Sequence, residues 1–480
     1  MKYDYVIVGA GPTGITIAYL LGKTGKTCAL LDQNDSIGGC HRVKRVNGMF
    51  TEHSPRVYLS SYVNTKTLLQ QMNTSFDALF TPYHFSIASI GSQVVKQLSF
   101  WENFILFTEF IQLIYNPFYD KSVSVQTFTQ QYEFSAASID YLDRLCRFSD
   151  GAAMDRYSMY QLLQLMNQQL FYQLYQPKLP NDVGLFPIMS CSLEATHHVT
   201  TMLNQTVLSL VYDDATRMVT GVQTVSGIVS GSTIVLAVPP PALYKLLTAS
   251  PSPVTHSFGS LSSWVTAASY NVDIAATFHW DTELTLPIVW GFPYSDWGLI
   301  SIPLTQYMTM NDTRSKTVIS TCITYLDVKS SVLLQSANEI ADKDQLVNEM
   351  FRQLKETYPT LPPPTTMLLS PTVYRQNHTW VEQDSGFFKS SSISYLSSRG
   401  VIPNLYQVGP QNGNGSSSFT TFEAAVTNGI AFVNRVQPSA GMSIASPLEL
   451  TSVIQWTVIG IVVAVALVFL IRYMIRSRTT

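Results

Sequence analysis

The first forty residues constrain the fold of this chain more than any other stretch. Val6 to Val8 form a short, continuously apolar run, as in parallel strands buried on both faces. Three glycines follow in the spacing G-x-G-x-x-G, namely Gly9, Gly11 and Gly14. The first permits a tight turn, the second lets a pyrophosphate approach the backbone, and the third lets a helix pack closely on the strand. The pattern predicts a helix that runs from about Pro12, through Thr13, to Gly22 and points its N-terminus at the phosphates.

A second predicted strand, Cys28 to Leu31, ends in an acid, Asp32. A carboxylate about twenty residues beyond the glycines can accept hydrogen bonds from both hydroxyls of an adenosine ribose, and it repels a 2′-phosphate. The segment therefore predicts a nucleotide-binding βαβ unit in which NADP is disfavoured.

Two further glycines, Gly38 and Gly39, extend this segment to the pattern D-x5-GG. With that pattern the chain resembles the flavoprotein superfamily of amine oxidases, protoporphyrinogen oxidases and phytoene desaturases. The resemblance implies FAD as the cofactor and a Gly-Gly pair close to its flavin-side phosphate. Cys40 stands where the superfamily usually has arginine, and Arg42 follows two places later, so both are candidate cofactor contacts.

The next segment, Val46 to Tyr58, is predicted to form a hairpin with Asn47-Gly48 as its turn. In the resembling superfamily the chain here returns towards the flavin ring. Glu52, His53 and Arg56 are therefore candidates for the active-site wall, and a solvated loop is the alternative. Histidine-bearing motifs also occur near this point in UDP-galactopyranose mutases. His53 therefore does not distinguish an amine-oxidase-like enzyme from a mutase.

The rest of the chain is predicted to alternate between two interleaved domains. Residues 1–72, 191–250 and 404–437 are assigned to a Rossmann-like FAD-binding domain, and residues 73–190 and 251–403 to an α+β substrate domain. The first substrate segment shows aromatic and apolar residues at helical spacing, which predicts a helical cap. The second alternates apolar and polar residues, which predicts a mostly antiparallel sheet with one helix from Ala341 to Tyr358.

The middle cofactor segment is predicted to begin with a helix from Leu193 to Asn204. Three strands are expected after it, over Thr206–Tyr212, Gly221–Val225 and Thr233–Val238. The resemblance implies that a strand residue near Val207 holds adenine through its backbone.

The last cofactor segment begins with a predicted strand, Leu405 to Val408, followed by Gly409 and a helix from near Thr421. It resembles the closing motif of the superfamily, in which the helix N-terminus faces the flavin. Phe422, Glu423 and Ala424 occupy the positions of that motif. Pro410 replaces the acid that usually follows the glycine and binds the ribityl chain.

Two absences bear on the chemistry. The strand region 263–280 holds no lysine, whereas many amine oxidases place one there beside the flavin, and this weakens an amine substrate. Residues 384–419 contain no cysteine, the residue through which monoamine oxidases attach FAD, so the FAD is expected to be non-covalent.

The C-terminal end predicts a membrane anchor. After a linker over residues 438–452, residues 453–471 form an apolar run long enough to span a bilayer, and a basic tail follows over 472–480. No secretory signal precedes the first strand, which favours a cytosolic body with a single-pass C-terminal anchor. The positive-inside rule favours the opposite orientation, because the arginines lie in the short tail.

Composition excludes other classes of protein. Only 13% of the residues are charged and the net charge is −3, so nucleic-acid binding has no support. The five cysteines are scattered without C-x-x-C spacing, which argues against a disulfide scaffold and against a metal site.

The combined prediction is an α/β, membrane-anchored, FAD-dependent oxidoreductase. It would remove hydride from a C–N or C–C bond of a small-molecule substrate and be reoxidised by oxygen. One alternative is a redox-neutral flavoenzyme, such as a UDP-galactopyranose mutase or an isomerase. Another is an inactive structural membrane protein that keeps the fold, an alternative motivated by Pro410, Cys40 and the missing lysine.

Overall fold

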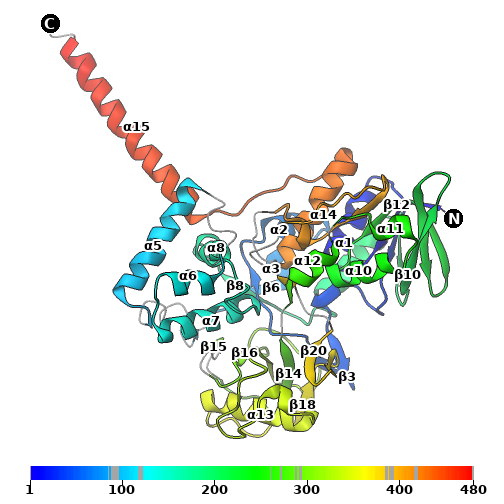
Figure 1. Cartoon of the computed structure of the whole chain (residues 1–480), viewed down its shortest axis with the longest axis horizontal. Coiled ribbons are helices and arrows are strands. Elements are labelled where there is room, and N and C mark those ends of the chain that lie inside the picture. The colour runs from blue at the N-terminus through cyan, green and yellow to red at the C-terminus, as the bar shows by residue number, and fades with distance from the viewer. Residues whose placement is uncertain are drawn as a thin grey trace.

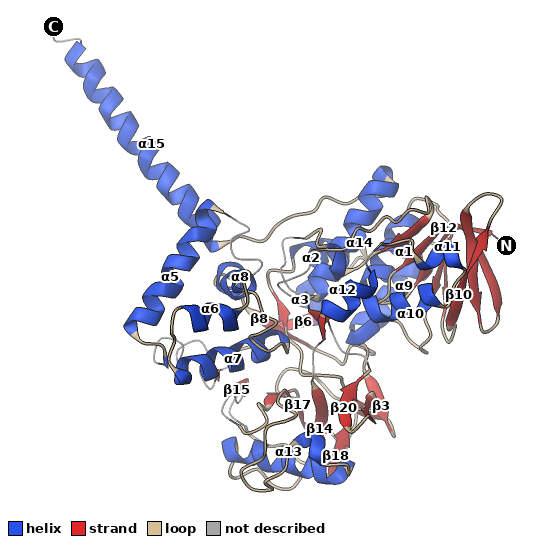
Figure 2. Ribbon diagram, in the orientation of Figure 1, coloured by secondary structure: helices blue, strands red, loops and turns tan. Residues whose placement is uncertain are grey.

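The computed structural model describes most of the chain, and Figures 1 and 2 show its arrangement. The described residues are 2–84, 86–87, 97–116, 123–259, 261–270, 273–286, 289–290, 295–383, 387–388, 394–415 and 420–477. A sheet covered by helices, a helical region and a smaller sheet region form the body, and the last helix extends away from it (Figure 1).

The largest sheet is parallel at its centre. β1 (Lys2–Val8) lies between β2 (Cys28–Leu31) and β12 (Gly227–Leu236), while β9 (Val199–Met202) pairs with β2 and β22 (Leu405–Gln407) pairs with β12. The hairpin of β10 (Val207–Asp213) and β11 (Met218–Thr224) continues the sheet antiparallel from β12. Three stretches that are far apart in sequence thus build one sheet.

Alternate residues of the central strands pack into two separate hydrophobic cores, because successive side chains of a strand point to opposite faces. Ile7 and Leu30 pack with the helices of one face, and Val6 and Leu31 pack with those of the other. The first face carries α1 (Pro12–Gly22), α2 (Val63–Gln71), α9 (Leu185–Glu194) and α14 (Phe422–Val436), and the second carries α10 (Pro240–Thr248), α11 (Ser252–Thr255) and α12 (Leu261–Ala267).

One predicted element is wrong. The segment expected to be a helix from Leu193 to Asn204 is the end of α9 followed by β9. The run Val199-Thr200-Thr201 is β-branched, which favours a strand, and Val199 to Met202 pair with the exposed edge of β2. This edge pairing is tertiary, so the local pattern did not reveal it.

The helical region contains four main helices: α5 (Phe100–Tyr115), α6 (Val125–Gln131), α7 (Ala136–Asp150) and α8 (Met159–Gln169). They share a core of their own. A small antiparallel sheet lies before and after this region in the chain, formed by β5 (Tyr58–Leu59), β8 (Leu174–Pro177) and β6 (Phe80–Pro82) in that order. The helices expected from the aromatic and apolar spacing are therefore present.

The second substrate segment forms an antiparallel sheet in the order β16 (Ile300–Pro303), β17 (Thr317–Ile323), β14 (Ile274–Trp280) and β18 (Thr366–Leu369). α13 (Lys343–Thr357) packs on it through Leu346, Met350 and Leu354, which follow each other at helical spacing. The predicted helix from Ala341 to Tyr358 is thus confirmed, with Asp342 as its N-cap. The hairpin of β3 (Lys44–Val46) and β4 (Met49–Thr51) is also confirmed, with Asn47 and Gly48 both at positive φ in its turn.

The last helix, α15 (Leu450–Ser477), extends beyond both ends of the predicted span of residues 453–471. Its segment Leu450–Arg472 is long and apolar enough to cross a membrane, and the most apolar stretch within it is not buried against the body. In Figure 1 it leaves the body beside α5 and α8.

Candidate active site

In the glycine turn between β1 and α1, two of the glycines lie so close to neighbouring backbone that a side chain would clash. Gly9 has φ +105, and a Cβ there would lie 2.4 Å from the carbonyl oxygen of Ala237. A Cβ on Gly14 would lie 1.9 Å from the carbonyl oxygen of Gly9. A Cβ on Gly11 would meet only Gly39, at 3.6 Å from its Cα. Gly9 and Gly14 are therefore required by the turn itself, whereas Gly11 borders open space.

That open space lies at the N-terminus of α1. Gly11 is the N-cap and offers no side chain to the first N–H groups of the helix, and the first turn carries no acid. Unpaired N–H groups and the partial positive charge of a helix start favour an anion. The N-terminus of α1 is therefore a fitting place for a pyrophosphate.

A cavity of about 480 Å³ runs along this turn, a volume typical of ligand sites. Most of the predicted cofactor residues line it: Gly9, Gly11, Pro12, Thr13, Asp32, Gly39, Cys40, Arg42, Val207 and Gly409. Its walls also include Thr421 and Ala425 at the start of α14, and Pro410 and Gln411 between β22 and α14. The structure thus brings segments from all three predicted parts of the cofactor domain to one space.

Asp32 lies at the end of β2, where the cavity wall turns. One carboxylate oxygen accepts a hydrogen bond from the backbone N–H of Ala10 at 2.8 Å, and the other accepts from the backbone N–H of Asn34 at 2.9 Å. Arg42 forms a 3.4 Å ion pair with the same carboxylate. These contacts fix the Asp32 carboxylate at the cavity wall. Arg42 therefore acts by positioning Asp32.

Five predicted cofactor residues lie outside the lining of this cavity: Gly14, Gly38, Phe422, Glu423 and Ala424. Gly38 has φ +124 and lies against the ring of Phe186, so its role is to shape the turn before Gly39. Phe422 is buried in the main core, with its ring 5.0 Å from that of His41.

Glu423 faces α2 rather than the cavity. Its carboxylate accepts hydrogen bonds from the backbone N–H groups of Asn64 and Thr65, at 2.8 and 2.9 Å, and from both of their side chains. Four donors at a helix start converge on one buried acid. Glu423 therefore joins α14 to α2.

The three candidates after the β3–β4 hairpin lie together in the interior. Arg56 bonds the ring of His53 and the backbone carbonyl of Cys40, and its Nε is 3.9 Å from a carboxylate oxygen of Glu52. Since Cys40 lines the large cavity, this arginine lies directly behind the cavity wall. The solvated-loop alternative is wrong for Glu52, because only 7% of its surface is exposed.

Asp273, which the sequence analysis did not single out, joins these residues. We call Glu52, His53, Arg56, Asp273 and His41 the acid–arginine cluster. Burial raises the pKa of Glu52 and that of Asp273 to about 7, while the charge of Arg56 lowers both. Burial lowers the pKa of His41 and His53 well below the usual value, and the charge of Arg56 lowers it further. The cluster therefore holds neutral imidazoles and two carboxyls poised between their charged and neutral forms near pH 7.

One oxygen of each carboxyl in the cluster is buried without a hydrogen-bond partner among the described residues: Oε1 of Glu52 and Oδ1 of Asp273. A small cavity of about 10 Å³, the space of about one water molecule, touches Glu52, Arg56 and His41. Carboxyls with raised pKa in such a place are able to accept or hold a proton. A lone acid at the start of an otherwise apolar strand was the available signal for Asp273.

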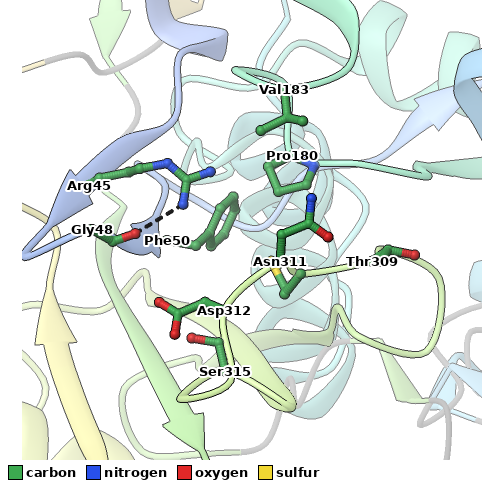
Figure 3. A pocket seen from close by; sticks show the side chains of 10 residues that line it. Arg45, Gly48, Phe50, Pro180, Val183, Thr309, Asn311, Asp312 and Ser315 are labelled. Carbon is green, nitrogen blue, oxygen red and sulfur yellow. Dashed lines mark hydrogen bonds between the residues drawn. The ribbon is translucent and has the colours of Figure 1, made fainter.

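Figure 3 shows a third cavity, of about 100 Å³, between the β3–β4 hairpin and the loop that holds Asp312. Its arginine, Arg45, donates to the carbonyl of Gly48 at 3.0 Å and pairs with Asp182 at 2.6 Å, so its charge is already compensated. Phe50 lines both this cavity and the small one beside Glu52. The large cavity with the acid–arginine cluster behind it is therefore the better candidate for chemistry.

Comparison with known proteins agrees with this geometry. Residues 7–72 match the family described as NAD(P)-binding Rossmann-like domain. No curated protein sequence matches the chain significantly. Solved structures match over almost its whole length. An oxidoreductase from Methanosarcina mazei has a TM-score of 0.64 at 12% identity, over 90% of this chain and 100% of that one.

Putrescine oxidase, solved with putrescine bound, has a TM-score of 0.60 at 14% identity, over 92% of this chain and 98% of that one. This chain shares the amine-oxidase fold. A protein from Exiguobacterium sp. 255-15, provisionally assigned as a protoporphyrinogen oxidase, has a TM-score of 0.57 at 12% identity, over 92% of this chain and 99% of that one. The α/β fold expected from the first forty residues is thereby confirmed.

Proposed function

We propose that this protein is an FAD-dependent oxidoreductase that removes hydride from a C–N or C–C bond of a small-molecule substrate and is reoxidised by oxygen. One observation carries the proposal. A single cavity runs from the N-terminus of α1 past Asp32 to the N-terminus of α14, and the acid–arginine cluster lies directly behind its Cys40 wall.

The cavity wall fits a pyrophosphate-linked dinucleotide. Gly39 has φ +58, and a Cβ there would lie 3.0 Å from Cα of Gly11. The two glycine segments therefore touch beside the open start of α1, where any side chain would narrow the space. Asp32 disfavours a 2′-phosphate, and the second glycine pair favours FAD over NAD.

Each part of the site has its own role in this proposal. The N–H groups of α1 bind the pyrophosphate, Asp32 holds the ribose, and the backbone near Val207 holds the adenine. When bound, FAD would supply the hydride acceptor. Glu52 or Asp273 would take the proton that leaves the substrate, because a carboxyl with a pKa of about 7 is an efficient base at neutral pH.

The cofactor would be non-covalent, because the sequence segment expected to hold a linking cysteine contains none. We also propose that α15 anchors the protein in a membrane with its body in the cytosol. The length and apolar composition of Leu450–Arg472 support the anchor. No nucleic-acid partner is expected, since the chain lacks a basic surface run outside its tail.

The visible absorbance of the detergent-purified full chain tests the proposal. Flavin bands that pass into the supernatant after acid precipitation would support non-covalent FAD. Peroxide release upon addition of amines or polyenes would then support the oxidase. A folded, colourless protein that does not take up FAD would overturn the proposal and favour the structural alternative. Reduction of bound flavin by substrate without peroxide release would favour the redox-neutral alternative.

A further inference from the structure

Helix α5 exposes an aromatic face to its surroundings. Its strongly exposed aromatic side chains are Phe100, Trp101, Phe104, Phe107 and Tyr115. Trp101, Phe104 and Phe107 follow each other every three residues, and Tyr115 lies near the C-terminal end of the helix. Phe100 is 86% exposed and Tyr115 is 82% exposed. The rings of Trp101 and Phe104 stack on each other with centroids 5.4 Å apart, so the N-terminal part of the helix presents a joined aromatic surface.

The opposite face of α5 is apolar as well. Ile105, Phe110 and Leu113 are buried in the core of the helical region. The two acids of the helix, Glu102 and Glu109, are also buried, and the sequence Phe100–Tyr115 contains no lysine or arginine. A surface helix of a water-soluble protein normally turns its charged residues outwards. The outward face of α5 is therefore suited to an apolar environment without charge.

The aromatic face adjoins the candidate membrane span. The side chain of Gln455 on α15 donates to the backbone carbonyl of Ile114, near the end of α5, at 2.7 Å. Leu450 and Ile454 of α15 pack on the core of the helical region. In Figure 1, α5 runs from the base of α15 crosswise to it, on the side of the body from which α15 leaves. If α15 crosses a bilayer, α5 lies at the level of its surface.

We propose that α5 is an interfacial membrane helix, with its aromatic face resting in the headgroup and outer acyl region of the bilayer that α15 crosses. Tryptophan and tyrosine are enriched at this level, because their rings are amphipathic. Because this face carries no charge, its binding to the bilayer would depend on burial of the aromatic side chains and would not require anionic lipids. With α15 crossing the bilayer and α5 lying along its surface, the body would have a fixed orientation on the membrane. This inference rests on the membrane anchor of the proposed function.

Nitroxide labels on the full chain, reconstituted into phosphatidylcholine vesicles, test this inference. The background is Cys191→Ser, because Cys191 is exposed, and the labelled background itself measures any reaction at Cys40. Labels at Phe104→Cys and, independently, Phe107→Cys report on α5. A label at Val462→Cys reports on α15, and one at Val225→Cys, in the exposed turn after β11, is the aqueous control. The readout is relaxation by oxygen, which partitions into lipid, against relaxation by a water-soluble nickel complex.

We expect the oxygen-to-nickel ratio at both α5 positions to exceed that at Val225 severalfold and to approach that at Val462. A ratio equal to that at Val225 would overturn the inference. Labels on α5 that neither oxygen nor the nickel complex can reach would also overturn the inference, because such shielding would indicate a protein partner, such as a second copy of the chain. An aqueous label at Val462 would overturn the anchor and, with it, the inference, because α15 would cross no bilayer. A lipid-exposed label at Val462 with aqueous labels on α5 would overturn the inference alone.

Discussion

Substitutions of Gly11 and Gly14 in the nucleotide turn are expected to affect different properties, one the affinity for FAD and the other the stability of the fold. We predict that Gly11→Ala keeps the stability of the protein and loses affinity for FAD, whereas Gly14→Ala loses stability. The reason lies in what an added Cβ would contact. At Gly11 it meets only Gly39, at an ordinary contact distance of 3.6 Å, and the φ of −77° suits alanine. At Gly14 it would lie 1.9 Å from the carbonyl oxygen of Gly9, which must move.

The magnitudes follow from these contacts. Replacing glycine by alanine at a compatible φ stabilises a protein by about 0.4–1 kcal/mol, and the weaker N-cap preference of alanine offsets this. The free energy of unfolding of Gly11→Ala is therefore expected within about 1 kcal/mol of wild type. Gly14→Ala forces backbone to shift in a close-packed turn, which costs about 3 kcal/mol or more.

Cofactor affinity is expected to respond in the opposite way. The new methyl group of Gly11→Ala occupies cavity space beside the start of α1 and displaces the pyrophosphate from the N–H groups. Losing one charge-assisted hydrogen bond of about 1.5–3 kcal/mol raises the Kd for FAD about 10- to 150-fold.

Urea unfolding of the apo-protein in detergent gives the stabilities, and quenching of FAD fluorescence on titration gives the Kd. A Gly11→Ala protein that binds FAD with the wild-type Kd would refute the placement of the pyrophosphate. A Gly11→Ala protein as unstable as Gly14→Ala would refute the steric argument.

Three further predictions concern buried charges. Glu423→Ala leaves the donors at the start of α2 without an acceptor and should lower the free energy of unfolding in urea by about 3 kcal/mol or more, with Glu423→Gln, which keeps one acceptor, losing less. Burial raises the pKa of Glu52 to about 7, so the folded chain holds a proton that the unfolded chain releases from about pH 4.5. The stability of wild type relative to Glu52→Gln should therefore fall from pH 5 to pH 7 by about 1.4 kcal/mol per pH unit, and parallel pH curves of the two proteins would contradict this. Arg56→Gln removes the charge that lowers the pKa of Glu52 and should extend the upper end of that window to higher pH, whereas Arg45→Gln, which removes a surface ion pair, should leave it unchanged.

The elements that the sequence predicted well are those whose geometry is decided locally. In the glycine turn, the close contact of Gly14 is with the carbonyl oxygen of Gly9, five positions away, and Asn47-Gly48 closes its hairpin by its own φ values. The helix of α13 begins at an aspartate N-cap and carries its apolar residues at one helical spacing. Such features are visible in sequence because the partners are neighbours.

The features that the sequence missed depend on partners far away in the chain. Glu423 was assigned to the cofactor, because no pattern shows that its four donors lie at Asn64 and Thr65. The pKa of Asp273 is raised only because folding buries its carboxyl, and the charge of Arg56, from another segment, partly offsets the rise. β9 is a strand because β2 offers it an open edge. In each case tertiary contact, rather than local propensity, decides the role of the residue.

The departure at Pro410 can be interpreted with these contacts in place. The turn after β22 closes without an acid, because the side chain of Asn412 accepts from the backbone N–H of Gly409 at 3.0 Å and donates to the carbonyl of Leu396 at 2.9 Å. At this end of the cavity lies the start of α14, whose backbone carries a partial positive charge and whose first turn holds Glu423. Because burial raises the pKa of both carboxyls in the acid–arginine cluster to about 7, protonation removes part of their negative charge at pH 7, and the positive Arg56 lies 3.9 Å from Glu52. Under the proposed function, the cofactor would therefore meet less negative charge than two ionised carboxylates would present, which favours its acceptance of hydride.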